Sequence, residues 1–400
     1  MESQFINYAV LPIPTLKNVA IVQIVTSLLA QPDIEMELKK MVKEVQDTER
    51  MQHVVGYYNF SEIGNIILHK LTLLCIPKKL HQEILDFVKP IGMHMIRCFD
   101  LRKWEHYYLY NSISKKTFHW TSWGTIDKIR TLEQAVFDNS SEIDSESQET
   151  LFEFACHYCL ENCIFELWNR MTKNQKEKLC SEGATTFKLS RLYLDSNLIS
   201  YWVSLLENKL TSFCERHEFG RRKHSIPLNM LMLAISSKSF LAVKYFWNKL
   251  ERKKRKDYYI LYWLDVGVKE YRRGEWHGSG YIRWYDCQVP NECTDIVLFL
   301  MSQLSDQKQQ KKAINSYSQI ILKSLFNHWP YSVYFLPTIN QMWDYIGENL
   351  HKEMIITIVT DAENTSRDLL RELWDITPEN IKDRFIRSCT NRPDLLDMLT

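Results

Sequence analysis

The stretch LFEFACHYCLENCIFELWNRM, residues 151–171, decides the fold that the sequence predicts. It aligns without a gap, at an offset of 79 residues, with part of LNMLMLAISSKSFLAVKYFWNKL, residues 228–250, so that Trp168 pairs with Trp247. In both copies apolar residues recur at the i, i+3, i+4 and i+7 spacing of an amphipathic helix. Two related segments of this kind indicate an internal repeat built from helices.

The i+4 slot of this helical template holds a tryptophan in five of six copies along the chain. The residues in the slot are Trp168, Trp202, Trp247, Met301, Trp343 and Trp374. Their mean spacing of about 41 residues is the length of a helix-pair repeat in solenoid proteins. We therefore expect each unit to contain this helix, a tight turn and a more polar second helix.

Helix-start signals follow two of these helices. Thr172 has Gln175 three residues later, which is the pattern of a capping box. Thr377 precedes Pro378, and proline is favoured in the first position of a helix. Both signals predict a second helix directly after the Trp-marked one.

On these residues the chain resembles a degenerate ankyrin-type repeat across roughly residues 150–400. A small residue, Ala155 or Ala234, stands in the first helix of each copy, and IFELW or VKYFW closes the second. The Thr-Pro-Leu-His opening of the family is missing, and Cys159 and Lys238 stand where its helix-turn glycine is expected. The resemblance implies stacked helix pairs and a protein-binding role, and it carries over no catalytic residue.

The fold class that we expect is all-α, a solenoid of imperfect antiparallel helix pairs. Gly and Pro number only 11 each, and hydrophobic residues make up 45%, which suits long helices with short connections. Aromatic enrichment allows one exception, a short β-hairpin near 107–120. The expected organisation is an N-terminal helical region 1–137, an acidic Ser-rich linker 138–150, and a solenoid 151–400 with an inserted loop at 267–292.

Two segments of the N-terminal region predict particular helices. NVAIVQIVTSLLA, which begins at Asn18, predicts a buried helix, because it is too short to span a bilayer and is interrupted by Gln23 and Thr26. IGNIILHKLTLLCIPKKLHQEILDFV, residues 63–88, predicts a helical hairpin that is broken at Pro77.

Three cysteines and a histidine crowd into FACHYCLENC, residues 154–163. Cys156, Cys159 and Cys163 are spaced i, i+3 and i+7, which places them on one face of a helix. A structural zinc site normally takes paired ligands from two separated knuckles, and the chain has no second C-x-x-C. We interpret the three thiols as core residues, and we expect no metal and no cofactor.

The candidate partner surface is the inserted loop at 267–292, in the longest gap between the Trp slots. Insertions between solenoid helices usually emerge as loops, and Trp, Tyr and Arg are enriched at interface hot spots. The candidate binding residues are Tyr271, Arg272, Arg273, Trp276, His277, Tyr281, Arg283 and Trp284. The alternative is an ordinary loop whose aromatic side chains pack back on the neighbouring helices.

A protein–protein interaction scaffold or adaptor, with another protein as its partner, is the function that these patterns favour. The alternative is RNA binding through the basic-aromatic segment 249–285, where Lys and Arg exceed Asp and Glu by five. A solvated helix face would explain the same charges. A weaker alternative is a repeat-containing effector or toxin-like protein.

Composition and the absence of known motifs argue against several classes of function. The net charge of +1 gives no global attraction to nucleic acid or membrane, and no phosphate-cradling, metalloprotease or nucleophile-elbow motif indicates an enzyme. We therefore expect no catalytic residue, no membrane partner and no small-molecule substrate. Ten cysteines spread over 400 residues favour the reducing cytoplasm. Nuclear import is the alternative, because KKRK resembles an import signal.

Overall fold

The computed structural model describes residues 14–52, 59–99, 118–138, 145–182, 196–216, 225–256, 259–266, 291–327, 330–342 and 367–388. In these ranges 82% of the residues are helical and none lies in a strand, so the all-α prediction is confirmed. One isolated antiparallel bridge joins Trp120 to Ile126. Most of the segment predicted as a β-hairpin, residues 107–117, lies outside the described ranges.

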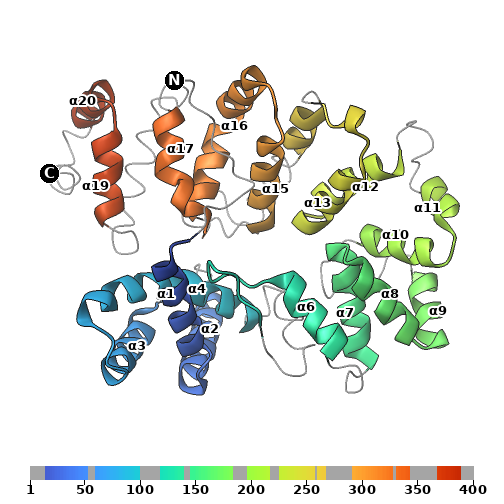
Figure 1. Ribbon diagram of the computed structural model, residues 1–400, viewed down its shortest axis with the longest axis horizontal. Coiled ribbons are helices and arrows are strands. Elements are labelled where there is room, and N and C mark those ends of the chain that lie inside the picture. The colour runs from blue at the N-terminus through green and yellow to red at the C-terminus, as the bar shows by residue number, and fades with distance from the viewer. Residues whose placement is uncertain are drawn as a thin grey trace. The chain divides into compact units, whose positions relative to one another are not determined.

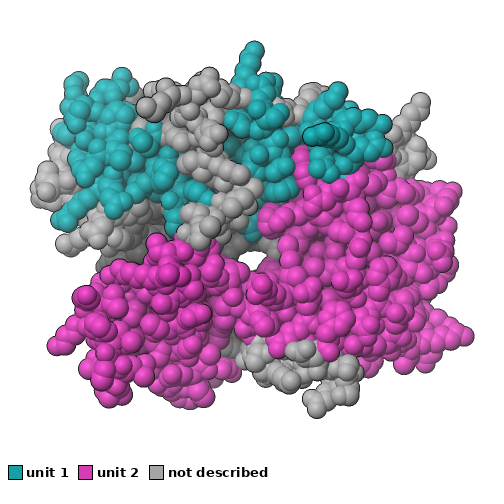
Figure 2. All heavy atoms as spheres, viewed as in Figure 1, with its two compact units in different colours: residues 1–11, 250–400 teal, residues 12–249 magenta. Residues whose placement is uncertain are grey.

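The chain divides into two compact units (Figure 2). The larger unit comprises residues 12–249, and the smaller comprises residues 1–11 and 250–400. Helix α6 (Lys128–Asp138) ends where the predicted acidic linker begins, and α7 (Ser145–Tyr158) starts inside the predicted linker range. The last part of that range is therefore helical, with Glu146 in the first turn, where the helix dipole favours an acidic side chain.

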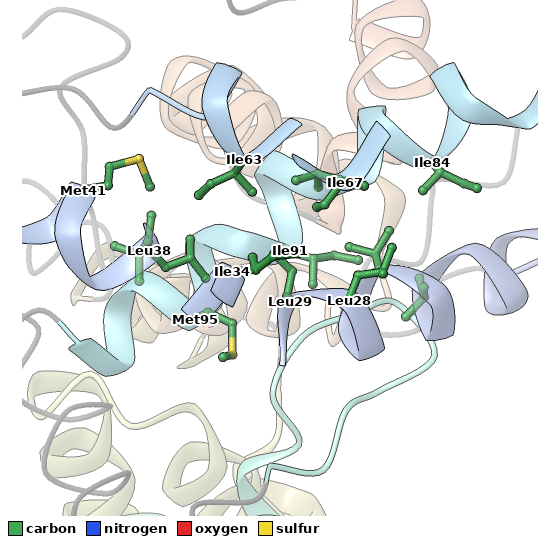
Figure 3. Packing of buried hydrophobic residues seen from close by; sticks show 14 of the residues in the cluster. Leu28, Leu29, Ile34, Leu38, Met41, Ile63, Ile67, Ile84, Ile91 and Met95 are labelled. Atoms are coloured by element: carbon green, nitrogen blue, oxygen red, sulfur yellow. The ribbon is translucent and has the colours of Figure 1, made fainter. Parts of the chain in front are cut away.

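Four helices form a bundle around one hydrophobic core in the larger unit (Figure 3). They are α1 (Leu16–Leu29), α2 (Pro32–Gln52), α3 (Ser61–Leu73) and α4 (His81–Phe99), with the 3-10 turn η1 (Lys78–Leu80) before α4. Leu29 of α1 and Ile67 of α3 are fully buried in this core. The buried helix predicted from Asn18 and the helical hairpin broken at Pro77 are both confirmed.

The chain that follows the bundle packs back on it. The bridge between Trp120 and Ile126 closes a turn in which Gly124 has a φ of 74°, in the left-handed region that favours glycine. Gly124 lies so close to Ile91 of α4 that an added Cβ would meet the isoleucine Cδ1 at 2.5 Å. This turn therefore has room for no side chain.

Three helix pairs of the larger unit share one kind of turn (Figure 1). The pairs are α7 with α8 (Glu161–Arg170), α10 (Ser196–Leu206) with α11 (Leu210–Arg216), and α12 (Ile226–Ser236) with α13 (Phe240–Lys249). At the turn of each pair, one residue has a positive φ: Cys159 at 56°, Asn208 at 57° and Lys238 at 57°. Cys75, between α3 and η1, has the same conformation at 56°.

Two backbone hydrogen bonds close these turns in the pattern of a Schellman motif. The amide of Cys159 donates to the carbonyl of Cys156 at 3.2 Å, and the amide of Leu160 donates to the carbonyl of Ala155 at 3.0 Å. The residues that lie 79 positions later make the same two bonds, at 3.0 and 3.1 Å. Cys159 and Lys238, the two residues at which a helix-turn glycine was expected, both adopt the left-handed backbone conformation that glycine favours.

Burial follows the same 79-residue correspondence in α8 and α13. Four aligned pairs are buried in both helices: Cys163 with Ala242, Ile164 with Val243, Leu167 with Phe246, and Trp168 with Trp247. The aligned residues Phe165 and Lys244 are both exposed. The two helix pairs therefore share their turn and their buried face, and they differ in the side chains on their exposed face.

The tryptophans do not all occupy one place in these pairs. Trp168 and Trp247 lie in second helices, whereas Trp202 lies in α10, the first helix of its pair. The Trp slot therefore does not mark one place in these pairs: Trp202 lies in the first helix, as the predicted unit of a Trp-marked helix, a turn and a second helix requires, and in this pairing Trp168 and Trp247 do not. Trp343 lies outside the described residues. Any amphipathic helix fits the four-point spacing, so the spacing alone cannot tell a first helix from a second one.

The predicted capping box starts α9 (Lys173–Glu182) and is confirmed. The amide of Thr172 donates to Gln175 Oε1 at 2.9 Å, and the amide of Gln175 donates to Thr172 Oγ1 at 3.4 Å. Gln175 Nε2 also donates to Ser145 Oγ at 2.9 Å, which ties α9 to the start of α7.

Helices also make up the described part of the smaller unit. In chain order they are η4 (Arg252–Lys254), residues 259–266, α15 (Asn291–Ser302), α16 (Gln307–Asn327), η5 (Tyr331–Tyr334), α17 (Phe335–Met342), α19 (Arg367–Ile376) and α20 (Glu379–Ser388). α16 packs against α15, η5 and α17. At the predicted second start signal, α20 begins directly after Pro378, but the Thr377 hydroxyl donates back to the Leu373 carbonyl of α19 at 2.6 Å.

Replacing Lys238 by glycine is expected to raise the free energy of unfolding by roughly 1 kcal/mol, because glycine adopts the left-handed conformation without a Cβ clash. Replacing Lys244 by glycine is the matched control, since Lys244 is exposed inside α13. There the exchange is expected to cost about 1 kcal/mol of helix stability. Urea denaturation measures both shifts, and shifts of the same sign would contradict a strained turn at Lys238.

Candidate protein-binding surface

Every residue of the predicted loop site lies outside the described part of the chain. These residues are Tyr271, Arg272, Arg273, Trp276, His277, Tyr281, Arg283 and Trp284, within the undescribed stretch 267–290. Their role as a partner surface therefore stays a prediction.

The start of the basic-aromatic segment, residues 249–256, is described, and part of its charge is already engaged. Lys253 Nζ lies 2.7 Å from Glu251 Oε2, and this hydrogen bond raises the pKa of the lysine and lowers that of the carboxyl. Arg255 donates to the Leu250 carbonyl from both Nε, at 3.2 Å, and Nη2, at 3.0 Å. These contacts leave fewer cations for a phosphate backbone than the count of Lys and Arg implies.

The three clustered cysteines are buried free thiols, which confirms their interpretation as core. Their placement on one helix is wrong, because Cys156 lies in α7, Cys159 forms the turn and Cys163 lies in α8. Burial raises the pKa of Cys159 and of Cys163 to about 12, so both thiols stay protonated at neutral pH. In the described ranges, no three His, Cys, Asp or Glu side chains are grouped so that they could hold a metal ion.

A polar and aromatic cluster joins α8, α10 and α13, and we name it the junction: Cys159, Glu161, Trp202, Tyr245 and Lys249. Tyr245 Oη donates to Glu161 Oε1, and Lys249 Nζ lies 3.3 Å from the same oxygen. The ring of Trp202 lies 5.7 Å from that of Tyr245, centroid to centroid. The Trp202 indole offsets part of the effect of burial on the pKa of the Cys159 thiol, but its Nε1 makes no hydrogen bond within the described residues.

Next to the junction, Ser239 connects the end of one helix to the start of another. Its hydroxyl donates to the main-chain carbonyl of His157 at 2.6 Å, near the end of α7. The same oxygen accepts from the amide of Ala242 at 3.4 Å, in the first turn of α13. One side chain thus hydrogen-bonds both a carbonyl at a helix end and an amide at a helix start.

The polar contacts of Glu161 with Tyr245 and Lys249 hold α8 and α13 together, and we name them the clasp. The hydrogen bond from Tyr245 lowers the pKa of Glu161, and burial together with this bond raises the pKa of Tyr245. The proton therefore stays on the tyrosine and the charge on the carboxylate at neutral pH. Neither group is tuned to exchange protons near pH 7, as a general acid or base would be.

Replacing Tyr245 by phenylalanine is expected to destabilise the fold modestly at neutral pH and much less in acid. A carboxyl group whose pKa is lowered by folding stabilises the fold above its unfolded pKa, and that contribution is lost as the pH falls through the folded pKa. The unfolded value for Glu161 is 4.5, so the difference between wild type and variant should shrink below that pH. Urea midpoints across this range measure it; a difference that is constant with pH would contradict the clasp.

The clearest exposed apolar surface in the described residues lies at the turn after α3, which the sequence reasoning missed. Leu73 is 68% exposed and Leu74 is 59% exposed, and the next residue, Cys75, is exposed as well. α8 adds a single exposed aromatic residue, Phe165, at 47%. A signal was present for Leu68 and Leu73, which fall outside the helical stripe of Ile63, Ile67 and Leu71. Leu74 falls on that stripe, three residues after Leu71, but it stands at the C-cap, after the end of α3.

None of the described helices is by itself long and apolar enough to cross a membrane. The bent pair Leu16–Leu29 and Pro32–Val45, with an angle of 76°, meets the requirement by length and composition only. Its buried apolar side chains belong to the hydrophobic core of the four-helix bundle (Figure 3).

No family model matches the chain, and neither a curated protein nor a solved structure matches it significantly. Function has therefore to be inferred from the described helices themselves.

Proposed function

We propose that the chain is a protein-interaction scaffold built on degenerate ankyrin-like helix pairs. The observation that carries the proposal is the correspondence between α7/α8 and α12/α13. The two pairs share a left-handed residue at the turn, the same two closing hydrogen bonds and the same buried face. Stacked helix pairs of this kind offer extended surfaces on which other proteins bind.

A comparison of exposed residues at corresponding positions of α8 and α13 supports a binding role. The two helices have similar residues on their buried face, but they differ on their exposed face. Phe165 in α8 corresponds to Lys244 in α13, and both are exposed. An aromatic side chain on an otherwise polar helix face is a frequent anchor in protein interfaces. We therefore place the partner contact on the outer face of α8, around Phe165, and on the predicted loop at 267–292.

Affinity capture from a reducing cell extract tests the proposal, with bound protein and bound RNA measured at low and at moderate salt. The wild-type chain is compared with Phe165→Ser and with a loop variant in which Arg272, Arg273, Trp276 and Trp284 are changed to alanine. Ile386→Ser is the control, because Ile386 is an exposed apolar residue, at 41%, in α20, outside every proposed contact.

The expected result is a salt-resistant protein partner that is lost with Phe165→Ser or with the loop variant and retained with Ile386→Ser. RNA whose capture falls steeply with salt would replace the scaffold with the RNA-binding alternative for segment 249–285. If the variants and the control all retain the same partners, the placement of the contact is wrong.

A further inference from the structure

The turn between α3 and η1 exposes three consecutive apolar residues, which we name the apolar tip: Leu73, Leu74 and Cys75. They come directly after the part of α3 in which Ile63 and Ile67 point into the core (Figure 3). Consecutive exposed apolar residues are unfavourable in water, and in soluble proteins they commonly mark an interaction site.

The apolar tip is held in shape by its own backbone. Cys75 has a φ of 56°, its amide donates to the Thr72 carbonyl at 3.2 Å, and the amide of Ile76 donates to the Leu71 carbonyl at 3.1 Å. His81 Nε2 lies at hydrogen-bonding distance, 2.8 Å, from the Ile76 carbonyl. A surface that is fixed before binding loses little conformational entropy when a partner docks.

Two lysines give the apolar tip a positive border. Lys78 and Lys79, both in η1, are exposed and have no ion pair within the described residues. Neighbouring charges are matched, since Lys70 Nζ lies 2.7 Å from Asp33 Oδ2 and Glu83 pairs with Lys17. The unmatched charge beside the apolar tip is therefore positive.

From this juxtaposition we infer that the apolar tip with Lys78 and Lys79 is a docking site for an acidic amphipathic segment of another protein. Leucines in the segment cover Leu73 and Leu74, and its carboxylates pair with the two lysines. Two cations and two leucines are too few for stable attachment to a membrane, which takes a larger basic cluster or a lipid anchor. The inference goes beyond the proposed function, because the apolar tip belongs to a different part of the larger unit from α8 and α13.

Fluorescence anisotropy of labelled synthetic peptides with the full chain tests the inference. The probes are an amphipathic Leu/Glu helix, the same helix with Lys in place of Glu, and a scrambled Leu/Glu sequence. The first probe is expected to bind best, and Leu73→Ser/Leu74→Ser is expected to weaken it by about tenfold or more. Lys78→Glu/Lys79→Glu is expected to reverse the preference toward the Leu/Lys helix.

Two controls match these changes. Leu16→Ser alters an isolated exposed leucine, and Lys43→Glu/Lys312→Glu reverses the charge of two exposed lysines elsewhere. Both are expected to bind the Leu/Glu helix as wild type does. Thermal unfolding checks that each variant is folded. We expect all of them to fold, because every substituted residue is exposed.

Three outcomes would overturn the inference: no preference of wild type for the Leu/Glu helix, an equal loss in the controls, or binding to phosphatidylserine vesicles that depends on Leu73 and Leu74 while the peptides fail. The last outcome would assign the apolar tip to a membrane. None of these outcomes tests whether a partner binds through Phe165 or the loop at 267–292. The docking inference and the proposed function can therefore be refuted independently.

Discussion

Replacing Trp202 by alanine is expected to lower the free energy of unfolding of the larger unit by about 3–5 kcal/mol. The side chain is 0% exposed, and its ring lies 5.4 Å from Tyr201 and 5.7 Å from Tyr245. Removing the indole leaves a cavity where α10 meets α13. A loss of this size is a large fraction of the total stability of an ordinary domain. Urea denaturation of the full chain measures it.

Phe165→Ala is the control for this prediction, since it also removes an aromatic ring from the same unit. Phe165 is 47% exposed, so we expect a change of about 0.5 kcal/mol or less. If Trp202→Ala and Phe165→Ala lowered the free energy of unfolding by similar amounts, the burial of Trp202 in the core would be contradicted.

Replacing Gly124 by alanine is expected to lower the free energy of unfolding by about 2–4 kcal/mol, from two separate causes. The φ of 74° is unfavourable for any residue with a Cβ. The new Cβ would also stand 2.5 Å from Ile91 Cδ1 and 2.6 Å from Ile91 Cγ1, so the isoleucine would have to move. Thermal or urea unfolding of the full chain measures the change.

Gly64→Ala provides a control of opposite sign. Gly64 lies inside α3, and a Cβ added there would meet nothing within 4 Å. Alanine is expected to stabilise that helix by roughly 0.5–1 kcal/mol, because it loses less backbone entropy on folding. If both exchanges changed stability in the same direction, the close packing of Gly124 against α4 would be refuted.

Much of the fold could be predicted because helical spacing records which side chains are buried. Ile164, Leu167 and Trp168 were assigned to one buried face, and the structure places them there. The same spacing could not show that Trp202 belongs to a first helix, since that depends on which helices cover it. It also could not show that the chain reverses at Cys159, where the left-handed residue is a cysteine instead of a glycine.

The candidate surface was harder to predict than the fold. Aromatic and basic composition pointed to the loop at 267–292, of which residues 267–290 lie outside the described ranges and Asn291 already begins α15. Leu73 and Leu74 were included in the predicted helical hairpin 63–88 without being distinguished from its core residues. Leu73 falls off the stripe of Ile63, Ile67 and Leu71, whereas Leu74 falls on it and is exposed at the end of α3, which spacing alone does not reveal.

The clasp at the junction also bears on the order in which the larger unit folds. Ser239 bonds to a carbonyl 82 residues earlier, and Tyr245 and Lys249 reach back 84 and 88 residues to Glu161. Contacts of such long sequence separation form only after a large loop has closed, whereas each Schellman turn joins neighbours. We expect the helix pairs to form early and the clasp to form late, so that the clasp governs the rate of unfolding more than the rate of folding.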